Sequence, residues 1–406
     1  MGSKLLESSL ESSLDPNRIA ANPAYSLIRI AEMSTGERDA LVELGADLTD
    51  REGGIDGVLV AATGSGLPDK VVDCAGVAMF RSLASGRCDQ VAGDGMFRLL
   101  YDEIITIESG AGPVTGAAAF EQLESTNQPD RPSGALSTMS YRALDTVARL
   151  RLPSREQICT RLYWFNRVPL SARWQRAIPG ESVVRRWLGD TIASGHQHER
   201  SNPSNLWVQA ASVENAGGWL SFVRHDDRRE LPSREFGYKL YLSPRPGQLH
   251  LVLPLAVAAT NETVTSRFKV GADAAGLLRP DKIVFYLADA SEVTALADRL
   301  ATALVGIDAQ GVPFSAAMTS DGLLSWGGDP TEDESPIGGG RESWRLSVCR
   351  RLAESMFAAQ RAGVAPATAV SFAARRLELD GVDIASFAPT HLISPTPVTS
   401  IKEQAA

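Results

Sequence analysis

The stretch RFKVGADAAGLLRPDKIVFY, residues 267–286, decides the fold of the larger part of this chain. Strand-like FKV and IVFY stand at its two ends, and a Gly/Ala loop with an Arg-Pro turn joins them. The window also holds four cations, which are Arg267, Lys269, Arg279 and Lys282. Because a buried charge without a partner is costly, cations at the ends of buried strands indicate that they face an anion. We therefore predict a pocket for one phosphate group.

A second segment, YKLYLSPRPG at residues 238–247, extends this pattern. In a strand, Lys239 and Tyr241 would project from one face, as Arg267 and Lys269 would in RFKVG. Two neighbouring strands of this kind would bring their polar groups into one cleft. The alternative is an ordinary antiparallel strand with one solvated face.

The order of the expected elements predicts an α+β fold, in which a mixed or antiparallel sheet is flanked by helices and a smaller N-terminal α/β region precedes it. Helical spacing appears early in the chain, and strands dominate the middle before helices return. We expect helices at 23–45, 291–305, 341–362 and 367–379, and strands at 57–62, 104–107, 238–243, 249–254, 266–270 and 282–287.

Shifts in composition suggest the domain limits. The polar segment at 124–138 is rich in Pro, Ser and Gly and has no apolar periodicity, which is typical of a linker. We expect a disordered leader at 1–22, an N-terminal α/β region for partner docking at 23–123, a linker at 124–150, the main domain at 151–385 and a flexible tail at 386–406.

Composition excludes several classes of protein. A net charge of −9 over 406 residues argues against general nucleic-acid binding, and 44% hydrophobic residues indicate a globular protein. No apolar run is long enough to span a membrane, and the N-terminus lacks the pattern of a signal peptide. Four scattered cysteines match no metal-ligand spacing and favour a reduced, cytoplasmic protein. We expect no metal and no cofactor.

Arg279 and Lys282 flank the proline turn and suit a phosphate. The guanidinium fork of arginine matches two phosphate oxygens, whereas lysine offers a compact charge or, if its pKa falls, a base. The alternative is an ion pair with Asp273 or Asp281.

Two further pairs of residues flank a glycine-rich break near the C-terminus. Trp326 and Trp344 would line a peptide groove, and Arg341 and Arg345 stand at the start of a helix, where anions bind. Core packing and helix capping are the alternatives.

Several motifs together resemble the HopA-type effector family. They are RLYWFNRVPLSARWQR, GYKLYLSPRP, RFKVGADAAGLLRPDK, GVPFSA, LLSWGGDP and SWRL, and the resemblance covers residues 154–362. Stand-alone bacterial relatives of that family occur with class V lanthipeptide and thioamitide biosynthesis. There a kinase-like protein phosphorylates Ser or Thr of a precursor peptide, and the relative is the lyase that removes the phosphate, leaving dehydroalanine or dehydrobutyrine.

The resemblance, together with the more distant OspF and SpvC phosphothreonine lyases, implies roles for the cations. Lys269 would be the base, with Lys239 as the second candidate. The distant lyases take their acid from a Lys-x-His strand, but Tyr241 stands at the position of that histidine. Either Tyr241 protonates the leaving oxygen or the phosphate departs with cationic help alone. The implied phosphate ligands are Arg279, Lys282, Arg267, Arg341 and Arg345.

The expected function is therefore a carbon–oxygen lyase that acts on phosphoserine or phosphothreonine in a ribosomally made peptide. Its expected partners are a kinase-like phosphotransferase and a precursor peptide with a leader, without nucleic acid or membrane. The alternatives are a non-catalytic module that binds phosphate or peptide, and a scaffold that activates the kinase-like protein.

Overall fold

A computed structural model describes most of the chain as two units. The described residues are 18–28, 33–36, 38, 57–61, 68–72, 74–86, 93–124, 132, 134–189, 207–210, 218–224, 237–330 and 342–398. Unit 1 comprises 1–129, 330–342 and 351–380, and unit 2 comprises 130–329, 343–350 and 381–406.

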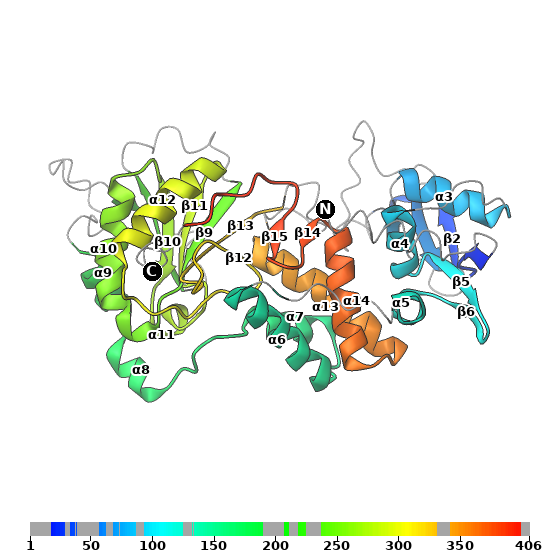
Figure 1. Ribbon diagram of the computed structural model, residues 1–406, viewed down its shortest axis with the longest axis horizontal. Helices are drawn as coiled ribbons and strands as arrows, with labels where there is room; N and C mark the ends of the chain where they lie inside the picture. The colour runs from blue at the N-terminus through cyan, green and yellow to red at the C-terminus, as the bar shows by residue number, and fades with distance from the viewer. Residues whose placement is uncertain are drawn as a thin grey trace, which may run out of the picture. The chain divides into compact units, whose positions relative to one another are not determined.

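Unit 2 is built on an antiparallel sheet of seven described strands (Figure 1). Their order across the sheet is β12-β13-β9-β11-β10-β8-β7. In that order the strands are Ala316–Ala317, Leu324–Gly328, Tyr238–Leu242, Ile283–Leu287, Arg267–Gly271, Trp219–Arg224 and Trp207–Gln209. The opening window therefore supplies two adjacent central strands, β10 and β11, which pair antiparallel.

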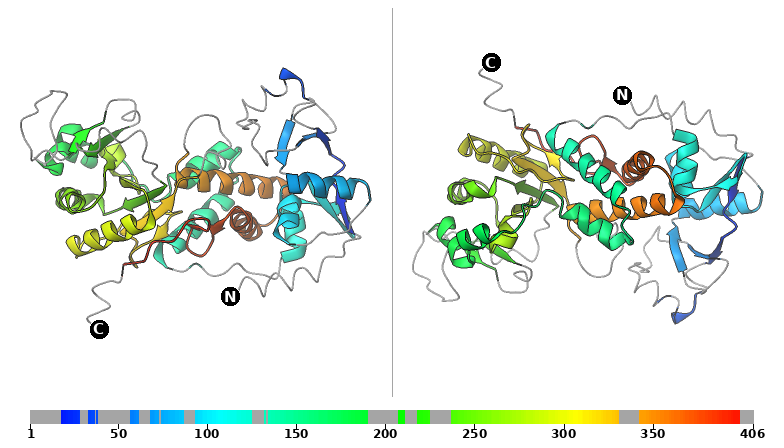
Figure 2. Two further views of the ribbon diagram at one scale, coloured as in Figure 1. Left: turned by 90° about the horizontal axis from the view of Figure 1, so that it is seen from above. Right: turned by 90° about the horizontal axis from the view of Figure 1, so that it is seen from below.

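One face of this sheet is apolar and covered by helices. Phe268 and Phe285 belong to its core, together with Leu253 of α10 and Leu296 of α12. The covering helices are α9 (Glu181–Leu188), α10 (Leu249–Asn261) and α12 (Ala290–Ala303). All the ribbon views place α10 and α12, coloured green to yellow, on the same side of the strands (Figures 1 and 2). Because side chains alternate along a strand, the residues between the core positions face the other side.

The remaining helices of unit 2 precede the sheet, connect its strands or follow its last strand. They are α6 (Ala135–Leu150), α7 (Arg155–Tyr163), α8 (Ala172–Ala177), α11 (Ala274–Leu277) and the first residues of α13 (Trp344–Ala362). A short hairpin of β14 (Val382–Asp383) and β15 (Ala388–Pro389) also belongs to unit 2.

Unit 1 holds two small antiparallel sheets and several helices. One sheet is β1 (Ile19–Ala21), β5 (Ile105–Ser109) and β6 (Gly112–Val114), and the other is β2 (Tyr25–Ile28), β3 (Gly57–Ala61) and β4 (Pro68–Val72). Its helices are α3 (Cys74–Ala84), α4 (Asp94–Tyr101), α5 (Gly116–Glu124), the rest of α13 and α14 (Pro366–Leu379). Over the described residues, no helix is both long and apolar enough to cross a membrane.

The α+β class is confirmed, but several expected elements differ. The expected strand at 249–254 is the start of α10, and the expected helix at 23–45 contains strand β2. A short apolar run fits a buried helix as well as a strand, so periodicity alone does not separate the two.

Four of the expected segments also differ in part from the structure. Residues 135–150 form α6 instead of a linker, and residues 351–380 belong to unit 1 instead of the main domain. The expected leader contains β1, and the expected tail contains β15, because each finds a pairing strand elsewhere in the chain.

Candidate functional site

The polar face of the unit 2 sheet brings four of the predicted residues together. Arg267 lies opposite Tyr286, which lies opposite Lys239 on the next strand. In the neighbouring row, Lys269 and Tyr241 flank the same β11 residue, so their Cα atoms are about 10 Å apart, two strand spacings. β9 and β10 are not neighbours as expected, because β11 lies between them, but the register places these four side chains on one face of the sheet.

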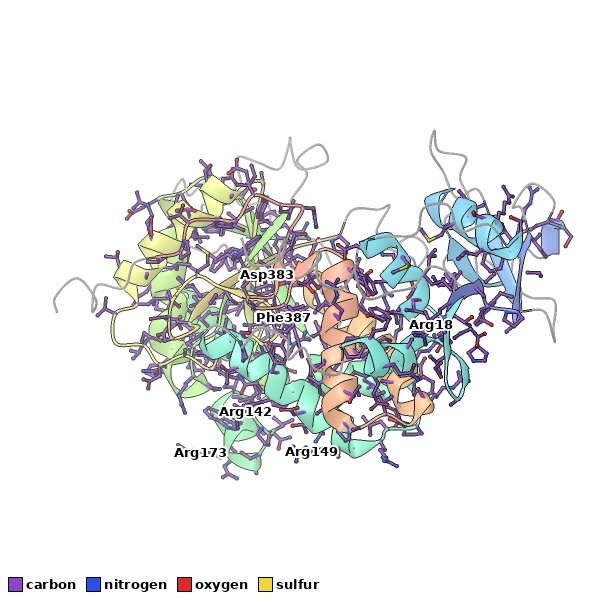
Figure 3. The ribbon with its side chains drawn as sticks, turned by 45° about the vertical axis from the view of Figure 1, so that its right-hand side comes forward. Arg18, Arg142, Arg149, Arg173, Asp383 and Phe387 are labelled. Carbon is purple, nitrogen blue, oxygen red and sulfur yellow. The ribbon has the colours of Figure 1, made fainter. Side chains whose placement is uncertain are left out.

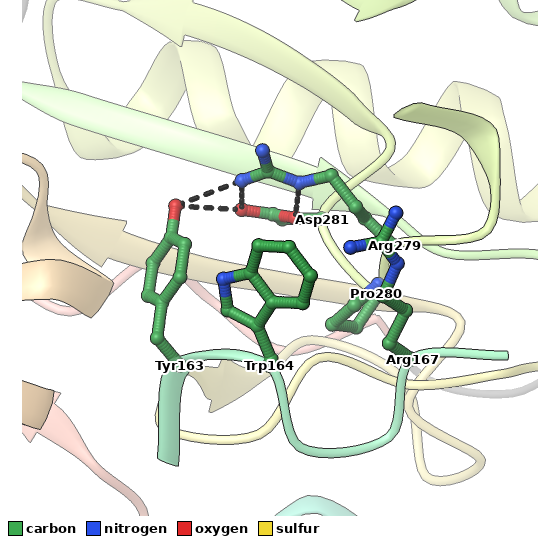
Figure 4. A pocket seen from close by; sticks show the side chains of 6 residues that line it. All are labelled: Tyr163, Trp164, Arg167, Arg279, Pro280 and Asp281. Carbon is green, nitrogen blue, oxygen red and sulfur yellow. Dashed lines mark hydrogen bonds and ion pairs between the residues drawn. The ribbon is translucent and has the colours of Figure 1, made fainter. Parts of the chain in front are cut away.

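Arg279 leaves the sheet edge and enters a network with Asp281 and Tyr163 (Figure 4). Its Nε and Nη2 donate to the two Asp281 oxygens at 2.9 and 3.0 Å, and Nη2 also lies 2.9 Å from the Tyr163 hydroxyl. Tyr163 donates in turn to Asp281 at 3.2 Å. The alternative of an ion pair with Asp281 is therefore realised, while Nη1 of Arg279 makes no hydrogen bond to the described residues.

Arg345 braces this network from inside the protein. It is 1% exposed, and its Nη1 lies 2.9 Å from Asp281 Oδ2. Nε donates to the Pro313 carbonyl at 3.1 Å and Nη2 to the Tyr163 carbonyl at 3.0 Å. Since all three nitrogens face protein groups, Arg345 is a positioning residue here and not the phosphate ligand that was expected.

The network fixes the charges of its members. Burial acts to raise the pKa of Asp281, but Arg345 and Arg279 outweigh it and hold this pKa well below its ordinary value. Burial, with the Asp281 charge, raises the pKa of Tyr163 to about 12. Asp281 is thus an anion and Tyr163 a neutral hydroxyl at ordinary pH.

Lys269 differs from the other lysines of the sheet because it contacts rings instead of a carboxylate. Its Nζ lies 4.6 Å from the centre of the Trp219 ring and 5.5 Å from that of Tyr286, and it has no hydrogen bond or ion pair with the described residues. Burial lowers its pKa; Asp281 opposes this shift and Arg279 adds to it. This is the setting in which a lysine serves as a base.

The other two candidate lysines, Lys239 and Lys282, have polar partners within the protein. Lys239 forms an ion pair with Asp329, so its ammonium group already contacts a carboxylate of the protein. Lys282 is fully buried, and its Nζ donates to the Pro244 carbonyl at 2.9 Å and to Gln310 Oε1 at 2.7 Å. Its expected role as a phosphate ligand does not fit, because its hydrogen bonds go to protein atoms.

Tyr241 is 3% exposed, and its hydroxyl has no hydrogen-bond partner in the described part of the chain. Burial first, and the Asp329 charge next, raise its pKa well above the ordinary value. A neutral hydroxyl that lacks a protein acceptor, on the same face as Lys269, is available to donate a proton to a ligand.

The predicted peptide groove is wrong. Trp326 is 3% exposed and stacks on Tyr238 at 5.8 Å on the apolar face of the sheet. Trp344 is equally buried and packs against Gly327, where a side chain would collide with its indole ring. Both rings stabilise the interior. Arg341, another expected phosphate ligand, lies outside the described residues.

A small pocket, partly open to solvent, lies beside Arg279. It is lined by Tyr163, Trp164, Arg167, Arg279, Pro280 and Asp281 (Figure 4). Arg167 is half-buried, lies 4.2 Å over the Trp164 ring and donates to the Ala275 carbonyl at 3.0 Å. Burial lowers the pKa of Arg167, and the like charge of Arg279 lowers it further. Two guanidinium groups that repel each other across a small pocket are suited to an anion.

The turn after α7 places this second arginine. Asn166 adopts φ 63°, a left-handed conformation that asparagine tolerates better than most residues. Its amide donates to the carbonyls of Gln310 and Gly311 at 2.8 and 3.0 Å, and Val168 N donates to Leu278 O at 3.0 Å. These bonds hold the turn against the segment that carries Arg279.

Sequence reasoning missed the pocket residues Tyr163, Trp164 and Arg167, although the motif RLYWFNRVPL contains all three. The available signal was that aromatic residues stand between two arginines in this motif. That signal does not reveal a partner more than a hundred residues away, which the fold alone brings close.

The comparisons with known proteins add little to this geometry. No protein-family model matches the chain, and no curated protein matches it. Among solved structures, it is similar to the effector protein of Pseudomonas syringae pv. tomato strain DC3000, with 12% identity and a TM-score of 0.38 over 64% of this chain and 99% of that one. It is also similar to the effector protein of Pseudomonas syringae pv. syringae strain 61, with 13% identity and a TM-score of 0.35 over 64% of this chain and 100% of that one. The likeness is weak, and no conclusion about activity follows from it.

Proposed function

We propose that this protein is a carbon–oxygen lyase that eliminates phosphate from phosphoserine or phosphothreonine in a peptide. The observation that carries the proposal is Lys269, a largely buried amine with a lowered pKa and no acidic partner among the described residues. It shares its sheet face with the Tyr241 hydroxyl and interacts electrostatically with Arg279 of the anion pocket. Base, acid and anion ligand are the three groups that this elimination needs.

The proposed reaction uses each group once. Neutral Lys269 takes the proton from Cα of the phosphorylated residue, and the electron pair forms the Cα–Cβ double bond as the Cβ–O bond breaks. Phosphate leaves with the bonding electrons, held by Arg279 Nη1 and Arg167. Tyr241 donates a proton to the leaving oxygen. The products are dehydroalanine or dehydrobutyrine and inorganic phosphate.

Asp281, Arg345 and Tyr163 would keep Arg279 in place before the substrate arrives. A guanidinium held at Nε and Nη2 loses little freedom on binding, and its Nη1 makes no hydrogen bond to the described residues. Such preorganised donors stabilise developing charge without reorganisation during the reaction. In the same proposal, a kinase-like partner phosphorylates a ribosomally made precursor peptide in the cytoplasm, and this protein acts on the product.

The test is elimination from a synthetic phosphothreonine peptide, followed by mass spectrometry. We expect wild type to release phosphate, and Lys269→Ala to lose roughly 10²- to 10⁴-fold in rate, the usual contribution of a general base. Lys269→Arg should fail as well, because it keeps the charge without a base. Arg279→Ala should accumulate phosphopeptide, whereas the matched control Arg299→Ala, on the exposed side of α12, should not.

Two results would overturn the proposal. Elimination at the wild-type rate by Lys269→Ala, with a native circular dichroism spectrum, would remove the base. Tight binding of the phosphopeptide without turnover would instead identify a binding module.

A further inference from the structure

A strongly basic segment runs through unit 2 on both sides of the pocket. Residues 142–176 contain eight arginines, no lysine and only two carboxylates, a charge of +6 within a chain of −9. Arg167 belongs to the pocket, and the other seven arginines are exposed. Such a concentration in an acidic protein is not a consequence of its composition.

The α6–α7 hairpin carries five of these exposed arginines, which are Arg142, Arg149, Arg151, Arg155 and Arg161. None of them forms an ion pair with the described residues. An exposed arginine without a carboxylate partner keeps its charge available to a ligand.

Two more exposed arginines, Arg173 and Arg176, belong to the short helix α8 beyond the pocket. Figure 3 shows Arg173 along the same lower edge of unit 2 as Arg142 and Arg149 of α6. We call the seven exposed arginines of α6, α7 and α8 the arginine face.

Apolar side chains are interspersed with these charges. Trp164 is 54% exposed at the pocket mouth, and Leu150 and Leu170 are 46% and 44% exposed nearby in sequence. A surface that combines arginines with exposed aromatic and aliphatic groups fits a peptide better than free ions in solution.

We propose that the arginine face binds an acidic stretch of the same peptide whose phosphorylated residue enters the pocket. This inference rests on the proposed function and names the recognition element of its substrate. Charge complementarity selects the occupant, because a short acidic segment meets only this face and not the acidic remainder of the chain. A long nucleic acid would also meet that remainder, which repels it.

The length of α7 also predicts how far the acidic stretch of the peptide should stand from the phosphorylated residue. Helix α7 has nine residues, from Arg155 to the pocket residue Tyr163, and at ~1.5 Å per residue it is roughly 13 Å long. An extended peptide covers that distance with about four residues. Acidic residues should therefore act when they stand about three to five positions from the phosphorylated residue.

The experiment tests four peptides against the full-length protein. The peptides differ in only two features. The target residue is either Thr or phosphothreonine, and a stretch of three residues that begins four positions from it is either three Glu or three Gln. Binding of the two Thr peptides is measured by fluorescence anisotropy. Because these peptides carry no phosphate to eliminate, the measurement reports binding alone. Elimination from the two phosphothreonine peptides gives kcat and KM. The variant is Arg151→Glu/Arg155→Glu, and the matched control is Arg81→Glu/Arg361→Glu, two exposed arginines of unit 1 with the same change in charge.

We expect the double variant to weaken binding of the Glu peptide and to raise its KM roughly 10-fold, with kcat unchanged, since each exposed charge pair contributes modestly. The Gln peptide and the control variant should show no change. At about 1 M salt, where the screening length is about 3 Å, Glu and Gln peptides should bind alike.

Other outcomes separate this inference from the proposed function. Equal KM values for Glu and Gln peptides, with normal elimination, would overturn the inference and leave the lyase standing. Charge-dependent binding without elimination would support the arginine face and overturn the lyase. An oligonucleotide of matched charge that binds more tightly than the Glu peptide would overturn the peptide assignment.

Discussion

At the residue scale, the distinguishing feature of Lys269 is its aromatic surroundings. Trp219 lies under both Lys269, at 4.6 Å, and Arg279, at 4.8 Å, so one indole ring holds two cations of the proposed site. Cation–π contacts stabilise the protonated amine modestly, and burial opposes it more strongly. The balance leaves a lysine that deprotonates more readily than one in water.

This balance predicts the pH dependence of elimination. The pKa of Lys269 lies below 10.5, so its neutral, basic fraction grows as pH rises through that pKa and then saturates. We expect kcat/KM to rise with pH to a plateau. Tyr241 should cause no decline below about pH 10, because its pKa is raised and it stays protonated.

Trp219→Leu tests the same balance, since it removes a ring that favours the protonated lysine. The apparent pKa should fall by roughly 0.5 unit, which corresponds to a cation–π contribution of about 0.7 kcal/mol. Trp174→Leu, in which the lost ring lies against Arg173, serves as the control. A profile that is flat from pH 6 to 10 would contradict the assignment of Lys269 as the base.

At the element scale, the passage from β10 through α11 to Arg279 depends on two facing glycines. A Cβ on Gly276 would lie 2.8 Å from the Gly271 Cα, and a Cβ on Gly271 would lie 2.7 Å from the Leu277 nitrogen. Only glycine permits this approach of backbone to backbone. Asp273 then begins α11, where its Oδ1 accepts from Gly276 N at 2.8 Å.

Gly271→Ala should therefore displace α11 and, with it, Arg279. We expect a loss of about 1–3 kcal/mol in the free energy of unfolding of unit 2, typical of overpacking, together with a raised KM for phosphopeptide. Denaturant titration and steady-state kinetics measure the two effects. Gly247→Ala, where an added Cβ meets nothing within 4 Å, should change neither quantity. Equal behaviour of the two variants would show that the approach is not tight.

A comparison of the expected and observed strands and helices shows which of them a local sequence pattern can predict. The patterns at 238–243 and 266–270 predicted strands where β9 and β10 lie, although not that β11 would separate them. The strand expected at 249–254 was wrong because its short apolar run fits a buried helix equally well, and the structure accommodates Pro254 inside α10. Hydrophobic burial against α9 and α12 outweighs the lost hydrogen bond, a contribution that no local pattern displays.

At the scale of the whole molecule, unfolding of unit 2 can be followed by tryptophan fluorescence. All seven tryptophans fall within it, so tryptophan fluorescence reports unfolding of the unit that holds the pocket. Inorganic phosphate, the proposed product, should raise this transition temperature. A hundredfold excess over Kd stabilises a folded state by about 2.7 kcal/mol.

The increase should disappear in Arg279→Ala and remain in Arg299→Ala, with chloride at matched ionic strength as the salt control. Because phosphate also stabilises proteins by exclusion from their surface, only the difference between the variants counts. An equal increase in both variants would show that phosphate does not bind in the pocket.

The sequence by itself determined the class of fold, the two central strands and the face to which their cations point, because alternation along a strand is a local property. Tertiary structure alone decided which cations have partners. Lys239 meets Asp329, Arg345 meets Asp281 and Lys282 meets Gln310, while Lys269 meets only rings. Each of these contacts joins residues that are distant in the chain. Burial and pairing, which set the pKa of each group, arise only when the fold brings such residues together.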